Sequence, residues 1–431
     1  MHFLSSGDAR HEELAESGDL LHSLARLELS ALNQNLAATF DTPLDRLRWS
    51  ATKWEKYRGR DVIPLWIADM DFPVAPAIER AVMAHVQHGN YGYTSPPADL
   101  AGDLIAHHAQ HYDWQIEPEW IVWLSGLVLG INLAVKACCG EGGSVLTFSP
   151  VYPPFLSAAP MQGRRTLEVP LTIDEAALAR GDLRYHIDFA RLEAACLPDT
   201  RLLLLCHPHN PVGSLFTRAD LDALADFCVH HDLCVCSDEV HCDLILDGST
   251  PHVPFARVLA ERSPADLARS ITLHGPGKVF NLAGLGIAWA IIPDAALRRR
   301  FRAVMQRLVP APCCFGFTAL QAALRDGEPW RQALLARLRS QRDQVSAALD
   351  AMSLPHSHPE ATYLTWIDGR RLTAKVGNAA HWFEQHGVGL SDGADFGAPG
   401  FVRLNFAATP SVLDEALRRM LEAVYRFDAG R

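Results

Sequence analysis

Lysine is scarce in this sequence. Of its 39 lysine and arginine side chains, only five are lysines: Lys53, Lys56, Lys136, Lys278 and Lys375. Lys278 lies in HGPGKVFNLAGLG (274–286), a stretch with no other charged side chain. It could simply extend from an apolar loop to water. However, an ε-amine can lose its proton and condense with an aldehyde or ketone, whereas a guanidinium stays protonated. Lys278 is therefore a candidate for covalent chemistry that arginine cannot perform.

An excess of positive charge is also missing. The chain has 39 basic and 50 acidic residues, with a net charge of −11, so it offers no basic face for nucleic acid or anionic lipid. No uninterrupted apolar run reaches the roughly 18 residues of a membrane span. The start, MHFLSSGDARHEEL, contains acidic residues before any apolar run could form. It does not predict a secretory signal, and we expect a cytoplasmic protein that acts on small molecules.

Regular cysteine spacing is absent. The ten cysteines form no paired C-x-x-C motif and lie in apolar segments, which predicts reduced, buried thiols rather than a disulfide framework. Cys234 and Cys236 fit a buried strand pattern, so we expect no metal centre. The competing interpretation is a zinc site drawn from Cys206, His207, His209, Cys234, Cys236 and Cys242.

Internal repeats and low-complexity linkers are absent as well, and 431 residues predict two domains. Short apolar strands alternate with amphipathic helices, which predicts an α/β fold whose mostly parallel sheet is covered by helices on both sides. The expected strands are SVLTF (144–148), RLLLLC (201–206), LCVCS (233–237), SITLH (270–274) and GIAWAII (286–292). We assign the large domain to 91–310, a smaller α+β domain to 42–90 with 311–431, and an N-terminal helical extension to 1–41.

Polar residues follow the predicted strands. HPHNPVG (207–213) offers Asn210, SDEVH (237–241) offers Asp238 and His241, and SPVYPPF (149–155) offers Tyr152. Lys278 follows the strand SITLH. In an open parallel sheet, ligands bind at the carboxyl ends of the strands, so we expect these side chains to share one site.

A second feature of this site is a predicted helix start in WLSGLVLGINLAV (123–135). The free amides of such a start, around Gly126, Leu127 and Val128, favour an anion such as phosphate. Further along, Arg403 in GFVRLNFA suits bidentate capture of a substrate carboxylate.

Together these parts match the requirements of pyridoxal 5'-phosphate. Lys278 would carry the cofactor as a Schiff base and move the Cα proton, while Asp238 would keep the pyridine nitrogen protonated. Tyr152 would stack on the ring, and Asn210 and His241 would reach its phenolic oxygen. The amides of residues 126–128 would receive the phosphate.

The chain resembles the MalY/PatB family of cystathionine β-lyase-like C–S lyases, which belong to the fold-type-I pyridoxal phosphate enzymes. The matching stretches are IPLWIADMDFPVAPAI (63–78), HGNYGYT (88–94), SPVYPPF, HPHNPVG, SDEVHCDL (237–244), GKVFNLAGL (277–285) and GFVRLNFA (400–407). The resemblance implies a homodimer with shared active sites, in which Tyr93 or Tyr91 reaches the cofactor phosphate of the other subunit. It also implies that Ala68 and Asp69 line the substrate side and that Tyr93 takes part in catalysis.

Two positions depart from related enzymes. These often have serine three residues before the Schiff-base lysine and arginine eight residues after it, whereas this chain has Gly275 and Gly286. His274 is a possible substitute as a phosphate ligand.

Three functions remain open at this point. A lyase would expel a thiolate from Cβ and release pyruvate and ammonia, whereas an aminotransferase would pass the amino group to a keto acid. A third possibility is a regulator that acts through a protein partner. The sequence shows no second arginine in a motif suited to a distal carboxylate, and the resemblance favours the lyase.

Overall fold

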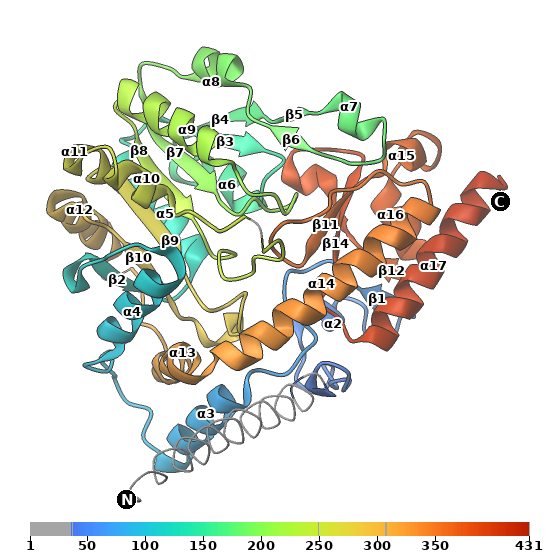
Figure 1. Cartoon of the computed structure of the whole chain (residues 1–431), viewed down its shortest axis with the longest axis horizontal. Helices are drawn as coiled ribbons and strands as arrows, with labels where there is room; N and C mark the ends of the chain where they lie inside the picture. The colour runs from blue at the N-terminus through green and yellow to red at the C-terminus, as the bar shows by residue number, and fades with distance from the viewer. Residues whose placement is uncertain (1–35, 37, 249, 307, 431) are drawn as a thin grey trace, which may run out of the picture.

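We describe the protein from a computed structural model of the chain (Figure 1). The structure describes residue 36 and residues 38–430, apart from residues 249 and 307. The predicted N-terminal helical extension falls largely outside these residues. Among the described residues, no helix combines the length and the apolar content needed to cross a lipid bilayer.

A seven-stranded sheet forms the centre of the larger part of the molecule. Its strands, in spatial order, are β2 (Ile121–Leu124), β10 (Ala288–Ile291), β9 (Ser270–His274), β8 (Cys234–Asp238), β7 (Thr200–Cys206), β3 (Ser144–Ser149) and β4 (Arg165–Pro170). The five strands from β9 to β4 are parallel to one another. Only β10 is antiparallel to both of its neighbours. The predicted, mostly parallel sheet is confirmed.

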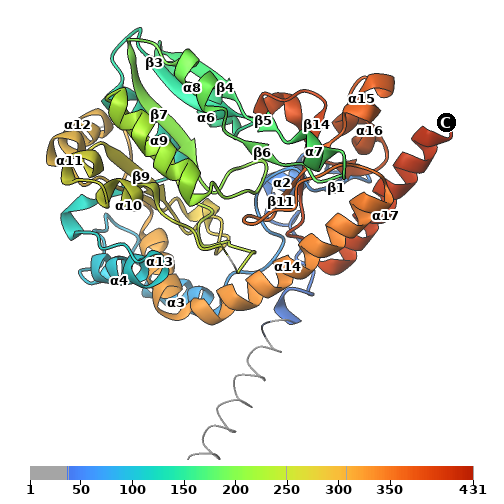
Figure 2. The same cartoon turned by 45° about the horizontal axis from the view of Figure 1, so that its top comes forward.

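Helices cover both faces of this sheet, because alternate strand residues are apolar on each side (Figure 2). In β7, Leu202 and Leu204 join a buried cluster with residues of α5 (Leu127–Cys138) and α12 (Ala295–Met305). Their neighbours Leu203 and Leu205 join a second cluster with α9 (Arg218–His230) and α10 (Phe255–Ala260). Each fully buried leucine stabilises the fold by about 2 kcal/mol.

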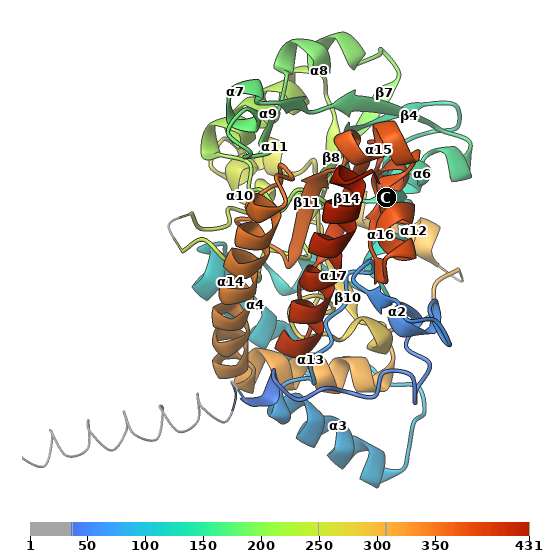
Figure 3. The same ribbon diagram turned by 90° about the vertical axis from the view of Figure 1, so that its right-hand side faces the viewer.

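The C-terminal part builds a second core around a three-stranded sheet. The sheet contains β11 (Leu364–Asp368), β14 (Phe401–Asn405) and β13 (Ser391–Asp392). Two long helices, α14 (Glu328–Ala351) and α17 (Pro410–Asp428), lie side by side over it (Figure 3).

The helical residues between 314 and 351 form two helices, α13 (Cys314–Asp326) and α14. They separate at Gly327, two residues before Pro329. Proline lacks the amide hydrogen needed to continue an α-helix and is tolerated only in its first turn.

Residues 42–90 contribute to the second core. Strand β1 (Ile63–Pro64) pairs in parallel with β12 (Val388–Gly389), and the Asp71 amide donates to the Ala407 carbonyl. Helix α3 (Pro76–His88) packs on α13, which lies in the 311–431 range of the expected small domain. The boundaries of that domain stay a prediction. Further α-helices and strands of the described part are α2 (Thr52–Glu55), α3 (Pro76–His88), α4 (Leu100–Tyr112), α6 (Pro153–Ser157), α7 (Glu175–Leu178), α8 (Phe189–Ala195), α11 (Pro264–Leu267), α15 (Arg370–Val376), α16 (Ala379–Gln385), β5 (Thr172–Ile173) and β6 (Tyr185–His186).

Candidate active site

A cavity of about 880 Å³ lies at the carboxyl ends of the central strands and is closed from the other side by the C-terminal part. Strands β7 and β8 bring Cys206 beside Asp238, and β9 adds the loop that carries Lys278. The predicted site residues that line this cavity are Ala68, Asp69, Gly126, Leu127, Val128, Tyr152, Asn210, Asp238, His241, Lys278 and Arg403. Parallel strands therefore gather residues that are far apart in the sequence.

The amine of Lys278 faces this cavity. Its Nζ donates a hydrogen bond to the carbonyl oxygen of Ala68 at 2.7 Å. Burial, with a smaller contribution from the nearby Arg403 charge, lowers the pKa of Lys278 to about 8. A sizeable fraction of the amine is therefore unprotonated near neutral pH, as a nucleophile or general base requires.

Asp238 provides a carboxylate at the end of β8, where it is 6% exposed. It accepts a hydrogen bond from the Val240 amide at 3.2 Å. Burial raises the pKa of Asp238 to about 6, and the Lys278 charge opposes this rise only in part. The carboxylate is thus poorly compensated, and a cationic N–H group in the cavity would stabilise its charged form.

The first turn of α5 forms an anion-binding edge of the cavity. Gly126 precedes this helix and no side chain caps the first turn, which leaves the amides of Leu127 and Val128 available. Ser125 also lines the cavity and adds a hydroxyl that we did not predict. Opposite it, Gly286 has a left-handed φ of 58°, a conformation that disfavours the arginine found in related enzymes.

Tyr152, Asn210 and His241 add polar side chains to the lining of the cavity. The Tyr152 amide donates to the Asn210 carbonyl at 3.1 Å, which fixes the two loops together. Burial and the Lys278 charge hold the pKa of His241 well below its usual range, so its ring is neutral. Within the described part of the chain, Nδ1 of His241 is buried without a hydrogen-bond partner.

Arg403 is a buried guanidinium on β14 that is 4% exposed. It donates to Asn210 Oδ1 at 2.9 Å and to the Trp66 carbonyl at 2.8 Å. Burial lowers the pKa of Arg403 to about 10, so it stays charged at neutral pH. None of the described carboxylates forms an ion pair with it, and its Nε has no partner among these residues. Such a charge suits the carboxylate of a ligand.

Some functional contacts escaped the sequence reasoning. Trp66 and Ser391 both hold the Arg403 Nη2, at 2.8 and 3.3 Å. Trp66 lies in the WIADMDF block, which could have indicated it, but Ser391 has no local signal. Asp69 faces the cavity and also pairs with Arg46 at 2.6 Å, so part of its role is to hold the N-terminal segment in place.

Three predicted residues lie away from this cavity. Tyr93 is fully exposed, and the hydroxyl of the exposed Tyr91 donates to the Val86 carbonyl at 2.9 Å. His274 is buried beneath the site, where its Nε2 lies 2.5 Å from Cys242 Sγ and its ring stacks on Trp289. Burial lowers the pKa of His274 to about 4, so it offers no positive charge to a phosphate.

The six residues that the sequence suggested for a zinc site do not come together in the structure. Among the described residues, neither Cys206 nor Cys234 belongs to a group of three or more side chains close enough to share an ion. Cys206 instead lines the cavity and contacts the Asn210 amide at 3.5 Å. Cys242 lies beside Asp243 and His274 in the buried layer below.

Known proteins are similar to this chain in both sequence and fold. The model of the family described as aminotransferase class I and II matches residues 60–420. Cystathionine beta-lyase PatB of Bacillus subtilis (strain 168) is 34% identical over 397 residues, which span 89% of this chain and 99% of the relative. The crystal structure of OvoB has a TM-score of 0.82 at 41% identity and covers 89% of this chain and 98% of its own. The structure of the pyridoxal phosphate-bound C–S lyase from Staphylococcus hominis has a TM-score of 0.81 at 26% identity, with coverage of 89% and 97%.

Proposed function

Because the chain belongs to the family of class I and II aminotransferases, we propose that it is a pyridoxal phosphate-dependent C–S β-lyase. Its substrates are cysteine thioethers such as cystathionine, and its products are pyruvate, ammonia and a thiol. The activity named for PatB and for the Staphylococcus hominis structure supports this choice.

The residues of the cavity fit pyridoxal phosphate. Lys278 would bind its aldehyde carbon, Asp238 its ring nitrogen and the first turn of α5 its phosphate. The poorly compensated Asp238 carboxylate and the uncapped helix start are the features that this cofactor satisfies. When bound, the cofactor supplies an electron sink for the pair released at Cα.

The chain's own groups bind the substrate and move its proton. Arg403 holds the α-carboxylate, and Asn210 keeps the guanidinium in position through the 2.9 Å contact. The Lys278 amine takes the proton from Cα, since its pKa of about 8 suits a base near neutral pH. The C–S bond at Cβ then breaks and the thiolate leaves. The remaining aminoacrylate takes up water and gives pyruvate and ammonia.

The observation that carries the choice of reaction is that Arg403 is the single arginine among the described residues that line the cavity. A dicarboxylate aminotransferase needs a second bidentate site for the distal carboxylate. The other lysine of the lining, Lys56, lies over the rings of Tyr57 and Trp66 at 5.0 and 4.7 Å and offers only a point charge. Cleavage of a thioether needs no second carboxylate site.

The test is an assay without an amino-group acceptor. Purified holoenzyme is incubated with L-cystathionine, L-cystine or an S-alkyl cysteine, and pyruvate and free thiol are measured. We expect the two products in equal amounts and with continuous turnover. A reaction that stops after one equivalent and resumes only when a keto acid is added would instead identify an aminotransferase.

Replacement of Arg403 with alanine is expected to lower kcat/KM for a cysteine thioether by roughly 10²–10³-fold, because loss of a buried charge-assisted contact costs about 2–5 kcal/mol. The absorption spectrum of the bound cofactor should remain, which separates a substrate-binding role from a folding defect. Arg371→Ala, which removes an exposed arginine paired with Asp428, is the control and should change neither value. Unchanged kcat/KM in Arg403→Ala would exclude the carboxylate role.

We also propose a homodimer in which Tyr93 of a second copy completes the cofactor site. Tyr93 is the most exposed aromatic residue among the large exposed hydrophobics, and Tyr91 beside it is 54% exposed. Tyrosine is enriched in protein–protein interfaces, so two neighbouring exposed tyrosines favour an interface at this surface. At positions 275 and 286, where related enzymes often have serine and arginine for the phosphate, this chain has glycine, so a hydroxyl from a second copy would replace a missing phosphate contact.

A mixing experiment tests the shared site. Lys278→Ala and Tyr93→Ala variants are each expected to have low activity. In a mixed dimer, one site combines the intact Lys278 of one chain with the intact Tyr93 of the other, so co-expression should restore up to about a quarter of the wild-type activity. If Tyr93 acts within its own chain, the mixture stays as inactive as its parents.

A further inference from the structure

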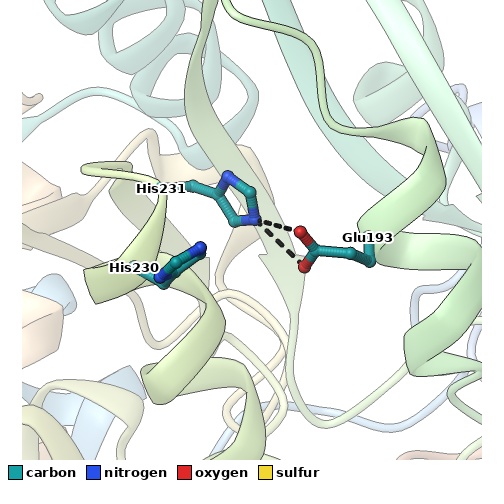
Figure 4. A group of neighbouring side chains, drawn as sticks. All are labelled: Glu193, His230 and His231. Atoms are coloured by element: carbon teal, nitrogen blue, oxygen red, sulfur yellow. Dashed lines mark hydrogen bonds and ion pairs between the residues drawn. The ribbon is translucent and has the colours of Figure 1, made fainter.

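Three side chains of residue types that can bind metal ions form a group on the surface of the larger part, and none of them lines the active-site cavity (Figure 4). Glu193 comes from α8, His230 from the last turn of α9, and His231 caps the end of α9. All three side chains point into the same gap between the two helices (Figure 4). No part of the proposed lyase mechanism uses them.

This group contains one potential metal ligand more than an ion pair between Glu193 and His231 requires. Nε2 of His231 lies 2.9 and 3.0 Å from the two Glu193 oxygens. A ligand atom of His230 is also close, since one ligand atom from each residue lies within 4.8 Å of the others. The two imidazole rings are 4.8 Å apart and nearly perpendicular. An ion pair accounts for the contact between Glu193 and His231, but it does not account for the position of His230 beside them.

The donor set matches a known coordination chemistry. Two imidazoles and one carboxylate bind Zn²⁺ in tetrahedral sites that keep one position for water, with ligand distances of about 2.0–2.2 Å. In such a site the ligand atoms are roughly 3–3.5 Å apart. Glu193 and His231 would separate slightly from their 2.9–3.0 Å contact, and the His230 atom, which lies within 4.8 Å of both, would move to the same spacing. The exposed fractions, 58% for the Glu193 side chain and 22% for His231, leave room for that movement and for entry of the ion.

The carboxyl end of α9 favours a bound cation electrostatically. The carboxyl end of α9 carries the negative pole of the helix dipole, which attracts a cation within the last turn. His230 and His231 occupy this turn and the cap. A cation bound there would connect α9, which covers β7 and β8, to α8.

We propose that Glu193, His230 and His231 form a surface site for a divalent transition metal ion, with Zn²⁺ as the representative ion. Nε2 of His231, one nitrogen of His230 and the Glu193 carboxylate are the ligands, and water fills the fourth position. The ion cross-links α8 and α9 and takes no part in the reaction at Lys278.

The test uses holoenzyme and Zn²⁺ in isothermal titration calorimetry. All proteins carry Cys313→Ser, because Cys313 is an exposed thiol that would bind zinc by itself. The test variants are Glu193→Gln and His230→Ala, and the control is His358→Ala, a half-exposed histidine 4.0 Å from Asp343. Loss of even an outer partner of a metal ligand weakens affinity by about 10–100-fold, so loss of a ligand should weaken it at least as much.

We expect one Zn²⁺ per chain in the parent protein and in His358→Ala, with an affinity that falls by at least about tenfold in both test variants. Saturating Zn²⁺ should also raise the Tm of the parent protein but not that of His230→Ala. The His230→Ala variant keeps the pair of Glu193 and His231, so it separates a metal site from an ion pair. Equal Zn²⁺ affinity in the parent and both test variants, or no binding at all in the parent, would overturn the proposal.

Discussion

Replacement of Lys278 with alanine is expected to abolish covalent cofactor binding and to lower lyase activity by at least about 10⁴-fold. The variant loses both the amine that binds the aldehyde carbon and the base that takes the Cα proton. Lys136→Ala, on the exposed side of α5, is the matched control and should keep full activity. Visible absorption of the bound cofactor after dialysis against an amine separates the two variants.

The lysine that forms the covalent bond with the cofactor can be identified directly. Borohydride reduction of the wild-type holoenzyme fixes the cofactor to its lysine, and mass spectrometry of the digested protein identifies that residue. With only five lysines in the chain, the assignment is unambiguous. A modified peptide that contains another lysine, or a Lys278→Ala variant with a normal bound-cofactor spectrum, would remove Lys278 from the account.

The second large effect concerns Asp238. Asp238→Asn should still bind cofactor but lose activity by roughly 10²–10³-fold, because an electrostatic partner aimed at developing charge typically contributes this much. The side chains are equal in size, so the cavity keeps its shape. Turnover close to that of the wild type would exclude a role for this carboxylate in catalysis.

The same variant should make the cofactor-free protein more stable. Burial raises the pKa of Asp238 from its ordinary 3.8 to about 6, so the ionised carboxylate destabilises the fold at higher pH. We expect Asp238→Asn to increase the free energy of unfolding by up to about 3 kcal/mol above pH 6. Well below the ordinary pKa of 3.8 the carboxyl is protonated in both states, and the difference should vanish. Denaturant titrations of both apoproteins at several pH values measure this, and equal stability throughout would contradict it.

The sequence predicted those parts of the site that follow from strand order. Asn210, Asp238 and Lys278 each come directly after an apolar strand, and parallel strands present their carboxyl ends at one edge. Predicting which residues lie at this edge requires only the apolar pattern of each strand and the alternation of strands and helices along the chain. The large sheet and its two layers of helices were predictable on the same grounds.

Contacts between distant segments were not predictable in this way. The Trp66 carbonyl and the Ser391 hydroxyl meet Arg403 because three segments converge. The WIADMDF block could have indicated Trp66, but the stretch around Ser391 has no pattern that indicates its contact. His274 looked suitable as a phosphate ligand because it precedes Lys278 in the loop. As the last residue of β9, it instead points its ring into a buried layer with Trp289.

Features that depend on a second chain also lie beyond sequence pattern. Nothing in the local sequence of Tyr91 and Tyr93 determines whether they serve their own cavity or that of another copy, and within one chain they are exposed. The domain boundaries likewise remain predictions. Residues 42–90 pair with the C-terminal part through β1 and β12, and the Met70 carbonyl accepts a hydrogen bond from Asn281 of the larger part.

The measurement that tests the central claim most directly is the partition between the two possible reactions when both are open. Holoenzyme receives an L-cysteine thioether together with 2-oxoglutarate, and pyruvate, thiol and glutamate are quantified in one sample. Because Arg403 is the one arginine that the described part of the chain places in the cavity lining, we predict pyruvate and thiol in equal amounts and little glutamate. Glutamate formed faster than pyruvate across several thioethers would contradict the assignment as a C–S lyase.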